Sequence, residues 1–524
     1  MNKEKISKIY LLNVPLENDY KNTLYFTSKE SQQSYFQSKV VDSLTLDDSA
    51  YQRKDKYIRY PKGYDDLYTC NYVMYQNSAY SNKWFYAFIT DLEYVNDELT
   101  YIHIETDVMQ TWFFDYQIKS SFVEREHVND DTTGKHTLPE SLETGEYVCN
   151  GKHEDPQGLD LSIFMAYSDY AGDTADVQGN LYGGIYSGMA YNVFQNSTEG
   201  IVTLNNMLKG YDEAGKGDAI NSIFMAPTWL AGAISDDLTA GGVSPYTEPK
   251  YYSLEVQKQT SLNGYTPRNK KLLCYPYNYL YASNNAGSTA IYNYELFSTD
   301  TCLFRVKGVL TPGGSIRVNP RDYKGVEVNN DEGLNAGKYP VCCWNTDAYT
   351  NWLTQNGVNN AISLVTGGVQ LAAGIGIIAG TGGLGALVGG GSVAGGLSMI
   401  TNTLAQKHQY SMVPDQVKGN TNCGDVVTGG GENCFMFYKM SIKKEYAEII
   451  DKYFDAYGYK VNQFKVPNKA HRSRWWYTKT LDINIDGGLP AKDMEKIKNC
   501  YNNGITFWRN AEEINNYTLS NGIV

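Results

Sequence analysis

Residues 357–405 read GVNNAISLVTGGVQLAAGIGIIAGTGGLGALVGGGSVAGGLSMITNTLA, an apolar stretch in an otherwise polar and tyrosine-rich chain. No Asp, Glu, Lys, Arg or His occurs between Asp347 and Lys407, which leaves 59 uncharged residues from 348 to 406. A glycine cluster at Gly380, Gly382 and Gly383 interrupts the stretch near its middle. We interpret this cluster as the turn of a long hydrophobic hairpin.

Each leg of this hairpin is long enough to cross a membrane. The legs, 358–379 and 384–405, hold 22 residues each. At a helical rise of 1.5 Å per residue, 22 residues span about 33 Å, whereas a bilayer core requires roughly 20 apolar residues. The pattern therefore predicts a membrane-active loop.

The same stretch makes a poor helix in water. Thirteen of the 30 residues from Gly367 to Gly396 are glycine, and each interior glycine costs about 1 kcal/mol relative to alanine. In lipid, backbone groups must bond internally and small residues let helices approach closely. We expect a segment that is flexible in water and becomes ordered in a bilayer. The alternatives are a buried or plugging loop without membrane action and an ordinary transmembrane anchor.

The predicted plug and membrane-contacting side chains are the large apolar residues of the two legs. They are Leu364, Val365, Val369, Leu371, Ile375, Ile377, Ile378, Leu384, Leu387, Val388, Val393, Leu397, Met399 and Ile400.

Composition excludes some classes of function. The 524 residues carry a formal net charge of −13, whereas proteins that hold DNA by its phosphates are basic. The nine cysteines include no CxxC pair, which indicates reduced thiols rather than disulfides or a zinc site. The first 15 residues lack the long apolar region of a signal peptide. The 45 tyrosines suit strands and subunit interfaces, because a tyrosine buries area and keeps a hydroxyl group.

Residues 67–115 predict an antiparallel β meander. Runs at 67–76, 83–95 and 101–115 are dense in aromatic and β-branched residues, and turn-forming residues separate them. Ile102 and Ile104 alternate with polar neighbours, as in a half-buried strand.

The middle of the chain, 129–345, reads as short strands separated by Gly, Asn and Asp. Strands are predicted within 161–167, 222–231, 271–281 and 302–310.

After residue 434, two helices are predicted, one within 441–460 that ends at Gly458 and one within 490–503 that ends at Gly504. The apolar face of the first comprises Ile442, Tyr446, Ile449, Ile450, Tyr453 and Tyr457. The basic stretch from Lys465 to Arg474 is interpreted as a contact for another subunit or an acidic wall.

No catalytic or metal site, and no cofactor, is predicted. Nucleotide-binding, zinc-protease and serine-hydrolase motifs are missing from the sequence. His103, Glu105 and Asp107 have metal-ligand chemistry, but we interpret them as a solvated or lumen-facing strand surface. The run from Glu124 to His127 is interpreted as a surface cluster of ion pairs.

Several long strings resemble the tail knob proteins of phi-29-like short-tailed phages. They are NDYKNTLYFTS (18–28), MYQNSAYSNKWFYAFITDLEY (74–94), YIHIETDVMQTWFFD (101–115), FVEREHV (122–128), YGYKVNQFKVPN (457–468) and NGITFWR (503–509). The resemblance covers 10–128 and 435–515 well, and 129–345 only weakly.

The resemblance implies a non-enzymatic virion protein at the tail tip, made in the host cytoplasm. Its fold is expected to be mainly β with some α, as an antiparallel β-rich subunit of a tube with a long hydrophobic loop. The expected partners are five further copies in a homo-hexamer, other tail proteins on the collar and tip sides, and the host membrane. Phage DNA is expected to pass through without sequence-specific contacts, and the apolar loops to plug the tube and then penetrate the membrane.

The resemblance and the sequence together suggest three regions. An upper tube domain combines 1–128 with 435–524, a lower β-rich knob spans 129–345, and the plug loop with its Gly/Asn-rich return spans 346–434. Two rival functions stay open, namely a host-receptor-binding tail protein and a tail-associated cell-wall hydrolase.

Overall fold

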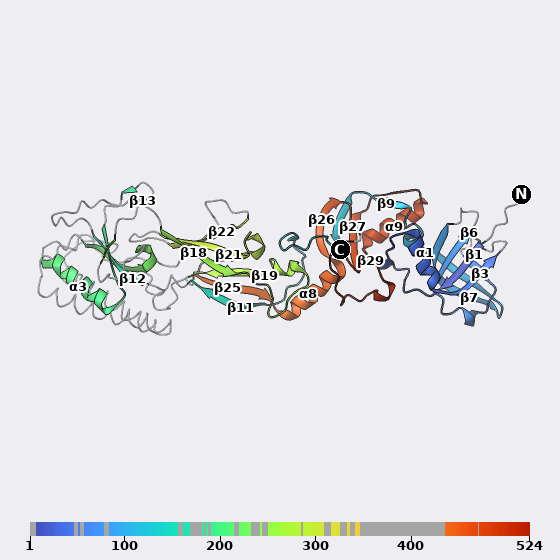
Figure 1. Cartoon of the computed structure of the whole chain (residues 1–524), viewed down its shortest axis with the longest axis horizontal. Helices are drawn as coiled ribbons and strands as arrows, with labels where there is room; N and C mark the ends of the chain where they lie inside the picture. Colours follow the sequence, from blue (N-terminus) through green and yellow to red (C-terminus); the bar gives the residue numbers. More distant parts are fainter. Residues whose placement is uncertain are drawn as a thin grey trace, which may run out of the picture. The chain divides into compact units, whose positions relative to one another are not determined.

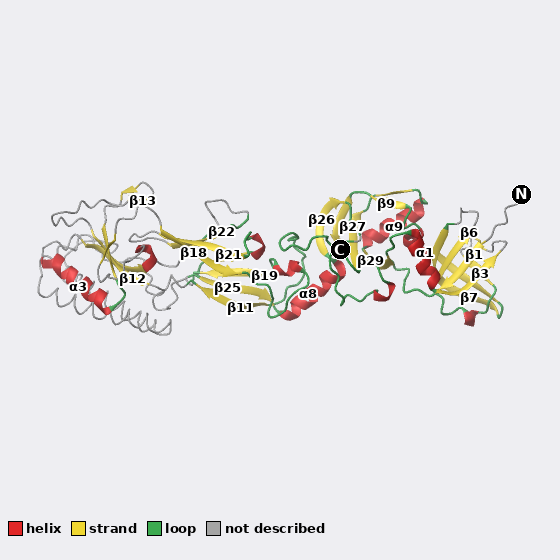
Figure 2. Ribbon diagram, viewed as in Figure 1, coloured by secondary structure: helices red, strands yellow, loops and turns green. Residues whose placement is uncertain are grey.

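A computed structural model describes most of the chain outside the hydrophobic stretch (Figure 1). The residues that it describes are 7–46, 51–52, 57–77, 83–155, 161–167, 181–182, 185–186, 190–213, 220–231, 241–243, 250–284, 287–308, 316–324, 333–335, 341–345, 435–469 and 471–524. Strands dominate, as Figure 2 shows, and a few helices accompany them. The predicted fold class, mainly β with some α, is confirmed.

The chain divides into two compact units. Unit 1 comprises 1–145, 265–272 and 444–524, and unit 2 comprises 146–264 and 273–443. Both ends of the chain therefore belong to the same unit, together with a short internal segment.

The largest sheet of unit 1 contains the predicted meander. Its strands β6, β7 and β8 are antiparallel neighbours, which confirms that prediction. In spatial order the strands are β3 (Val40–Leu46), β1 (Ser7–Leu12), β6 (Tyr72–Asn77), β7 (Trp84–Asn96), β8 (Leu99–Thr106), β5 (Tyr57–Tyr60) and β4 (Tyr51–Gln52).

A second sheet of unit 1 joins strands from the two ends of the sequence. In spatial order they are β2 (Asn22–Leu24), β29 (Ile505–Trp508), β27 (Trp475–Asp482), β10 (Ser121–Glu126) and β26 (Tyr459–Lys465). A two-stranded ladder pairs β9 (Tyr116–Ile118) with β28 (Ile485–Gly487).

Five helices and five 3-10 turns accompany these strands within the described residues. The helices are α1 (Lys29–Ser38), α2 (Val108–Thr111), α3 (Thr198–Glu213), α8 (Lys444–Tyr457) and α9 (Ala491–Asn503). The turns are η1 (Tyr64–Asp66), η5 (Thr228–Ala231), η6 (Lys270–Leu273), η7 (Tyr294–Leu296) and η10 (Ala511–Glu513). The sequence pattern did not predict α3.

Aromatic side chains form the core between the two sheets of unit 1. Trp475 and Trp508 are fully buried, with ring centroids 5.1 Å apart. They belong to one cluster with Phe36 of α1 and with Tyr72 and Phe88 of the large sheet. Burying such large side chains stabilises the fold through area removed from water and through ring packing.

Helix α8 differs from its predicted apolar face. Its buried side chains are Ala447, Ile450, Asp451 and Phe454, while Ile449 is 64% exposed. Asp451 is buried because it accepts hydrogen bonds from the 265–269 segment, including the Tyr265 hydroxyl at 2.7 Å and the backbone N–H of Asn269 at 3.0 Å. This carboxylate holds an internal segment of the chain in unit 1. The predicted helix ends at Gly458 and Gly504 are confirmed, and both glycines have positive φ.

Unit 2 is built from antiparallel sheets. One contains β11 (Tyr147–Glu154), β25 (Met436–Ile442), β19 (Asn278–Ser283) and β20 (Thr289–Tyr292). Another contains β17 (Gly241–Val243), β15 (Ala190–Phe194), β12 (Leu161–Tyr167), β16 (Ile220–Pro227) and β24 (Val341–Asn345). A third contains β18 (Lys250–Gln257), β21 (Thr301–Gly308), β22 (Ile316–Arg321) and β23 (Leu334–Asn335), and β13 (Leu181–Tyr182) pairs with β14 (Ile185–Tyr186).

The three larger sheets of unit 2 share one core, in which Phe164, Phe304 and Phe437 are fully buried. Cys302 contributes a free, buried thiol to it.

Candidate functional site

The predicted plug and membrane residues, from Leu364 to Ile400, lie outside the described residues, as do Gly380, Gly382 and Gly383. Their roles stay predictions. Among the helices that the structure does describe, none combines the length and the apolar character needed to span a bilayer.

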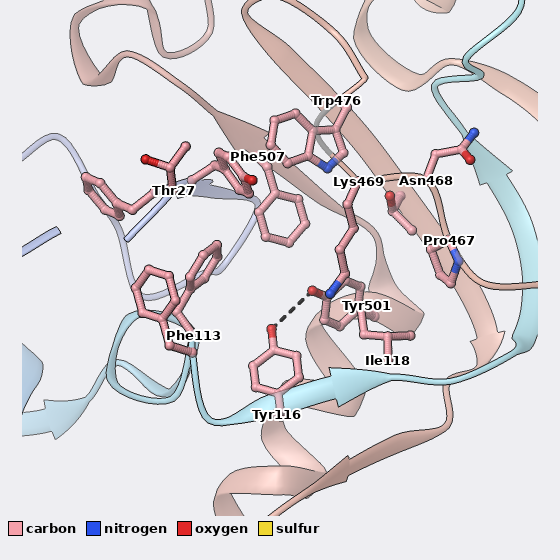
Figure 3. A pocket seen from close by; sticks show the side chains of 14 residues that line it. Thr27, Phe113, Tyr116, Ile118, Pro467, Asn468, Lys469, Trp476, Tyr501 and Phe507 are labelled. Atoms are coloured by element: carbon pink, nitrogen blue, oxygen red, sulfur yellow. Dashed lines mark hydrogen bonds between the residues drawn. The ribbon is translucent and has the colours of Figure 1, made fainter. Parts of the chain in front are cut away.

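Unit 1 contains an aromatic pocket with a volume of about 220 Å³ (Figure 3). Six segments of the sequence line it. They are the residues after β2, the residues between α2 and the end of β9, the residues after β26, and residues of β27, α9 and β29. The residues that line it are Tyr25, Phe26, Thr27, Phe113, Phe114, Tyr116, Ile118, Pro467, Asn468, Lys469, Trp476, Thr478, Tyr501 and Phe507.

Stacked rings make the walls of the aromatic pocket rigid. The Trp476 and Phe507 rings are parallel within 9°, with centroids 5.4 Å apart. The Tyr25 and Trp476 rings pack edge to face, with centroids 4.8 Å apart. The Arg509 guanidinium lies 5.4 Å from the Tyr25 ring centroid. Such edge-to-face and stacked geometries are the favoured arrangements of aromatic pairs.

Two phenols form the polar floor of the pocket. The hydroxyl oxygens of Tyr116 and Tyr501 lie 3.1 Å apart, as the dashed line in Figure 3 marks. Burial raises the pKa of both side chains well above the usual value, so both stay neutral at physiological pH.

One wall of the pocket carries a cation. Figure 3 shows the side chain of Lys469 extending from the rim into the pocket toward Tyr501. Loss of hydration lowers the pKa of Lys469, and among the described residues Lys469 forms no ion pair. The aromatic pocket is therefore suited to an apolar or aromatic group that carries a negative charge.

A buried carboxylate positions this wall. Glu126 has no exposed side-chain surface and accepts hydrogen bonds from the backbone N–H of Asn468 at 2.8 Å and from the Asn468 amide at 3.0 Å. It also pairs with Lys465. Burial raises the pKa of Glu126, while these donors stabilise the charged form.

The interpretation of the run from Glu124 to His127 as a surface cluster of ion pairs holds only for Glu124, which is partly exposed and pairs with Lys479, and is wrong for the other three residues. Arg125, Glu126 and His127 are only 8%, 0% and 5% exposed. Arg125 pairs with the buried Glu140, which also binds Lys271. The sequence alone did not reveal this, because the partners Glu140 and Lys271 come from distant positions.

His103, Glu105 and Asp107 do not form a common site. His103 contacts Glu93 at 2.9 Å, and Glu105 pairs with Lys496. Asp107 is buried and caps α2 by accepting hydrogen bonds from the backbone N–H groups of Met109 and Gln110. The described residues contain no cluster of potential metal ligands.

His127 is expected to make unit 1 less stable in acid. Its Nδ1 accepts a hydrogen bond from the Tyr477 backbone N–H at 2.8 Å, so this nitrogen carries no proton in the folded state. Its Nε2 lies 3.0 Å from the Asp455 carbonyl oxygen and donates to it. Burial, together with the nearby Arg472, lowers the pKa of His127 to about 3.

The unfolded chain binds a proton at this histidine near pH 6.5, whereas the folded chain resists protonation until about pH 3. The contribution of His127 to the free energy of unfolding is therefore fully present above pH 6.5. The free energy of unfolding falls as the pH drops below 6.5, and at pH 5 it is lower by about 2 kcal/mol. Denaturant unfolding at pH 7.5 and pH 5 measures the change. His127→Gln should remove about 2 kcal/mol of the stability difference between pH 7.5 and pH 5. If the variant keeps the wild-type pH dependence, protonation of His127 is not its cause.

Comparison with known proteins adds independent information. A family model described as Bacillus phage phi29, Tail knob protein gp9, C-terminal domain, matches residues 244–522, and one described as Caudoviral major tail protein N-terminus matches residues 5–117. The tail knob protein gp9 of Bacillus phage phi29 is 26% identical, and that of Bacillus phage B103 is 28% identical. Each alignment covers 98% of this chain and 97% of the relative. The solved structure of the bacteriophage C1 tail knob protein, gp12, has the same fold, with a TM-score of 0.66 at 16% identity over 99% of this chain and 100% of that chain.

Proposed function

Because this chain belongs to the phi29 tail knob protein gp9 family, we propose that six copies form the distal tail tube through which the phage genome is ejected. The protein is a structural component of the phage tail. The hexamer, the passage of DNA and the membrane role are the proposal.

In this proposal the three regions of the sequence form three parts of the tail tube. Residues 1–128 with 435–524 form the upper tube, residues 129–345 form the lower knob, and residues 346–434 form a loop that plugs the lumen. Contacts with tail proteins on the collar and tip sides complete the assembly. A ring of identical subunits forms when one surface patch binds a different patch on the next copy and the rotation between copies closes.

The net charge of −13 supports an inner wall over which DNA slides. A wall rich in Lys and Arg would bind phosphates and release their counterions, which would hold the genome in place. An acidic wall repels the phosphates instead.

The observation that carries the membrane role is the 59-residue stretch without charged side chains or histidine, from 348 to 406. Six such loops can bury one another in a tube lumen. After release they meet lipid, where two legs of 22 residues match the bilayer thickness. The loops then penetrate the host cell membrane and line a channel.

Dye release from liposomes tests this role. The assembled wild-type protein should release dye at some pH between about 4 and 8, and a variant that lacks 358–405 should release none while still forming rings in electron micrographs. Val369→Asp should weaken release, because Val369 lies at the middle of the first leg and a charge at the bilayer centre costs about 2.5–3.5 kcal/mol per copy. Asn359→Asp, at the end of a leg, is the matched control and should have little effect.

The outcomes separate the parts of the proposal. Equal release from the wild type and the deletion variant would refute the membrane role and leave the plug. A purified wild-type protein that stays monomeric by light scattering at high concentration, with no rings visible, would refute the tube itself.

A further inference from the structure

The aromatic pocket has room for one aromatic side chain. Its volume of about 220 Å³ exceeds the roughly 150 Å³ of an engineered apolar cavity that holds benzene. Its walls offer ring faces and edges, and Lys469 adds an ammonium group without an ion-pair partner among the described residues. A fitting occupant is therefore an aromatic ring with a carboxylate beside it.

The hairpin tip of unit 1, residues 91–98, has this chemistry; it comprises the end of β7 and the turn to β8. Its sequence DLEYVNDE contains four acidic residues and no basic residue. The Tyr94 side chain is 59% exposed. Its hydroxyl donates a hydrogen bond to the Asp97 carboxylate at 2.7 Å, so the phenol and the carboxylate are held together. Asp97 and Glu98 form no ion pair with any described residue.

We propose that the hairpin tip of one copy inserts Tyr94 into the aromatic pocket of the next copy, with Asp97 or Glu98 facing Lys469. The inference rests on the proposed ring and names the contact that builds it. Charge complementarity selects this occupant, because the tip carries four negative charges and the pocket rim a cation.

The contact joins two different surfaces of the same chain. Such a head-to-tail contact propagates from copy to copy and closes into a ring when the rotation permits. A self-complementary contact would stop at a dimer instead. Inserting Tyr94 also removes an exposed aromatic ring from water, and aromatic anchors in pockets carry much of the binding energy of interfaces.

Photo-crosslinking tests the contact in the full-length protein. With p-benzoylphenylalanine in place of Tyr94, illumination of the assembled protein should join copies, and mass spectrometry should map the crosslink to the segments that line the pocket, 25–27, 113–118, 467–478 or 501–507. A mixture of isotopically light and heavy protein distinguishes crosslinks between copies from those within one copy. Crosslinks to other segments, or only within a copy, would overturn the inference.

Charge reversal gives a second readout. Lys469→Glu should raise the concentration needed for half-maximal assembly by about tenfold or more, because it faces an acidic tip. Adding Asp97→Lys and Glu98→Lys to that variant should restore assembly. Lys452→Glu, which reverses an exposed lysine on α8, is the matched control and should leave assembly unchanged.

A matched pair of tyrosines completes the test. Tyr94→Ala should impair assembly as Lys469→Glu does, whereas Tyr68→Ala should not, although Tyr68 is 69% exposed. The reverse result would show that Tyr68 is the anchor and overturn the inference. If wild-type rings form but Lys469→Glu assembles normally, the inference fails while the proposed tube stands. If the wild type forms no ring, the proposed tube fails first.

Discussion

Glu140→Ala is expected to lower the free energy of unfolding of unit 1 by about 3–5 kcal/mol. The Glu140 side chain has no exposed surface and pairs with Arg125 and Lys271, whose side chains are 9% and 3% exposed. It also accepts a hydrogen bond from the backbone N–H of Lys460 at 2.9 Å. Removal of the carboxylate leaves two cations buried without their counterion.

Hydrogen exchange of peptides from β10 and β26 measures this loss locally, which matters because a chain of two units does not unfold in a single step. Glu143→Ala removes an exposed carboxylate nearby and should change stability by less than about 0.5 kcal/mol. Adding Lys271→Met to Glu140→Ala should recover part of the loss, since one unpaired cation disappears. A loss under about 1 kcal/mol for Glu140→Ala would show that Arg125 and Lys271 become hydrated in the variant and do not stay buried without a counterion.

Gly458→Ala is expected to cost about 2–5 kcal/mol in unit 1. Gly458 ends α8 at a φ of +63° and donates its N–H to the Phe454 carbonyl oxygen at 2.8 Å. An L side chain in this left-handed conformation costs roughly 1–2 kcal/mol. An added Cβ would also lie 2.2 Å from the Glu126 carbonyl oxygen, and overpacking of this kind adds about 1–3 kcal/mol.

The clash is with backbone rather than with a movable side chain, so β26 would have to shift away from β10. Gly488→Ala is the control, because no heavy atom lies within 4 Å of the Cβ that it would add. Thermal unfolding of both variants compares them. Equal melting temperatures would mean that the turn at Gly458 relaxes freely.

Patterns within a short stretch of sequence correctly predicted strand β8 and the end of helix α9, because the structure of each depends on residues that are close in the sequence. The period-two pattern around Ile102 and Ile104 predicted β8, because both side chains alternate into the core of one sheet. Gly504 predicted the end of α9, because only glycine accepts its φ of +93° without strain. The predicted buried face of α8 was wrong at Asp451. A pattern of apolar residues does not include a carboxylate, yet Asp451 is buried.

The buried polar groups required the tertiary structure. Asp451 is buried because it binds the segment around Asn269, which is 182 residues away in the sequence. Arg125, Glu126 and His127 are buried for the same reason, since their partners are Glu140, Asn468 and Tyr477. A charged residue enters a core only with its partner, and the sequence does not show which distant residues become neighbours.

The sequence by itself determined the aromatic β meander, the two C-terminal helices and the presence of a charge-free stretch, since each depends on periodicity or composition within one segment. The tertiary structure decided the aromatic pocket, because its walls come from segments around Tyr25, Phe113, Lys469 and Phe507. The interpretation of the basic stretch from Lys465 to Arg474 as a contact for another subunit or an acidic wall stays a prediction. Only folding placed Lys469 beside aromatic rings, because long-range packing assembles such a cavity and no local pattern encodes it.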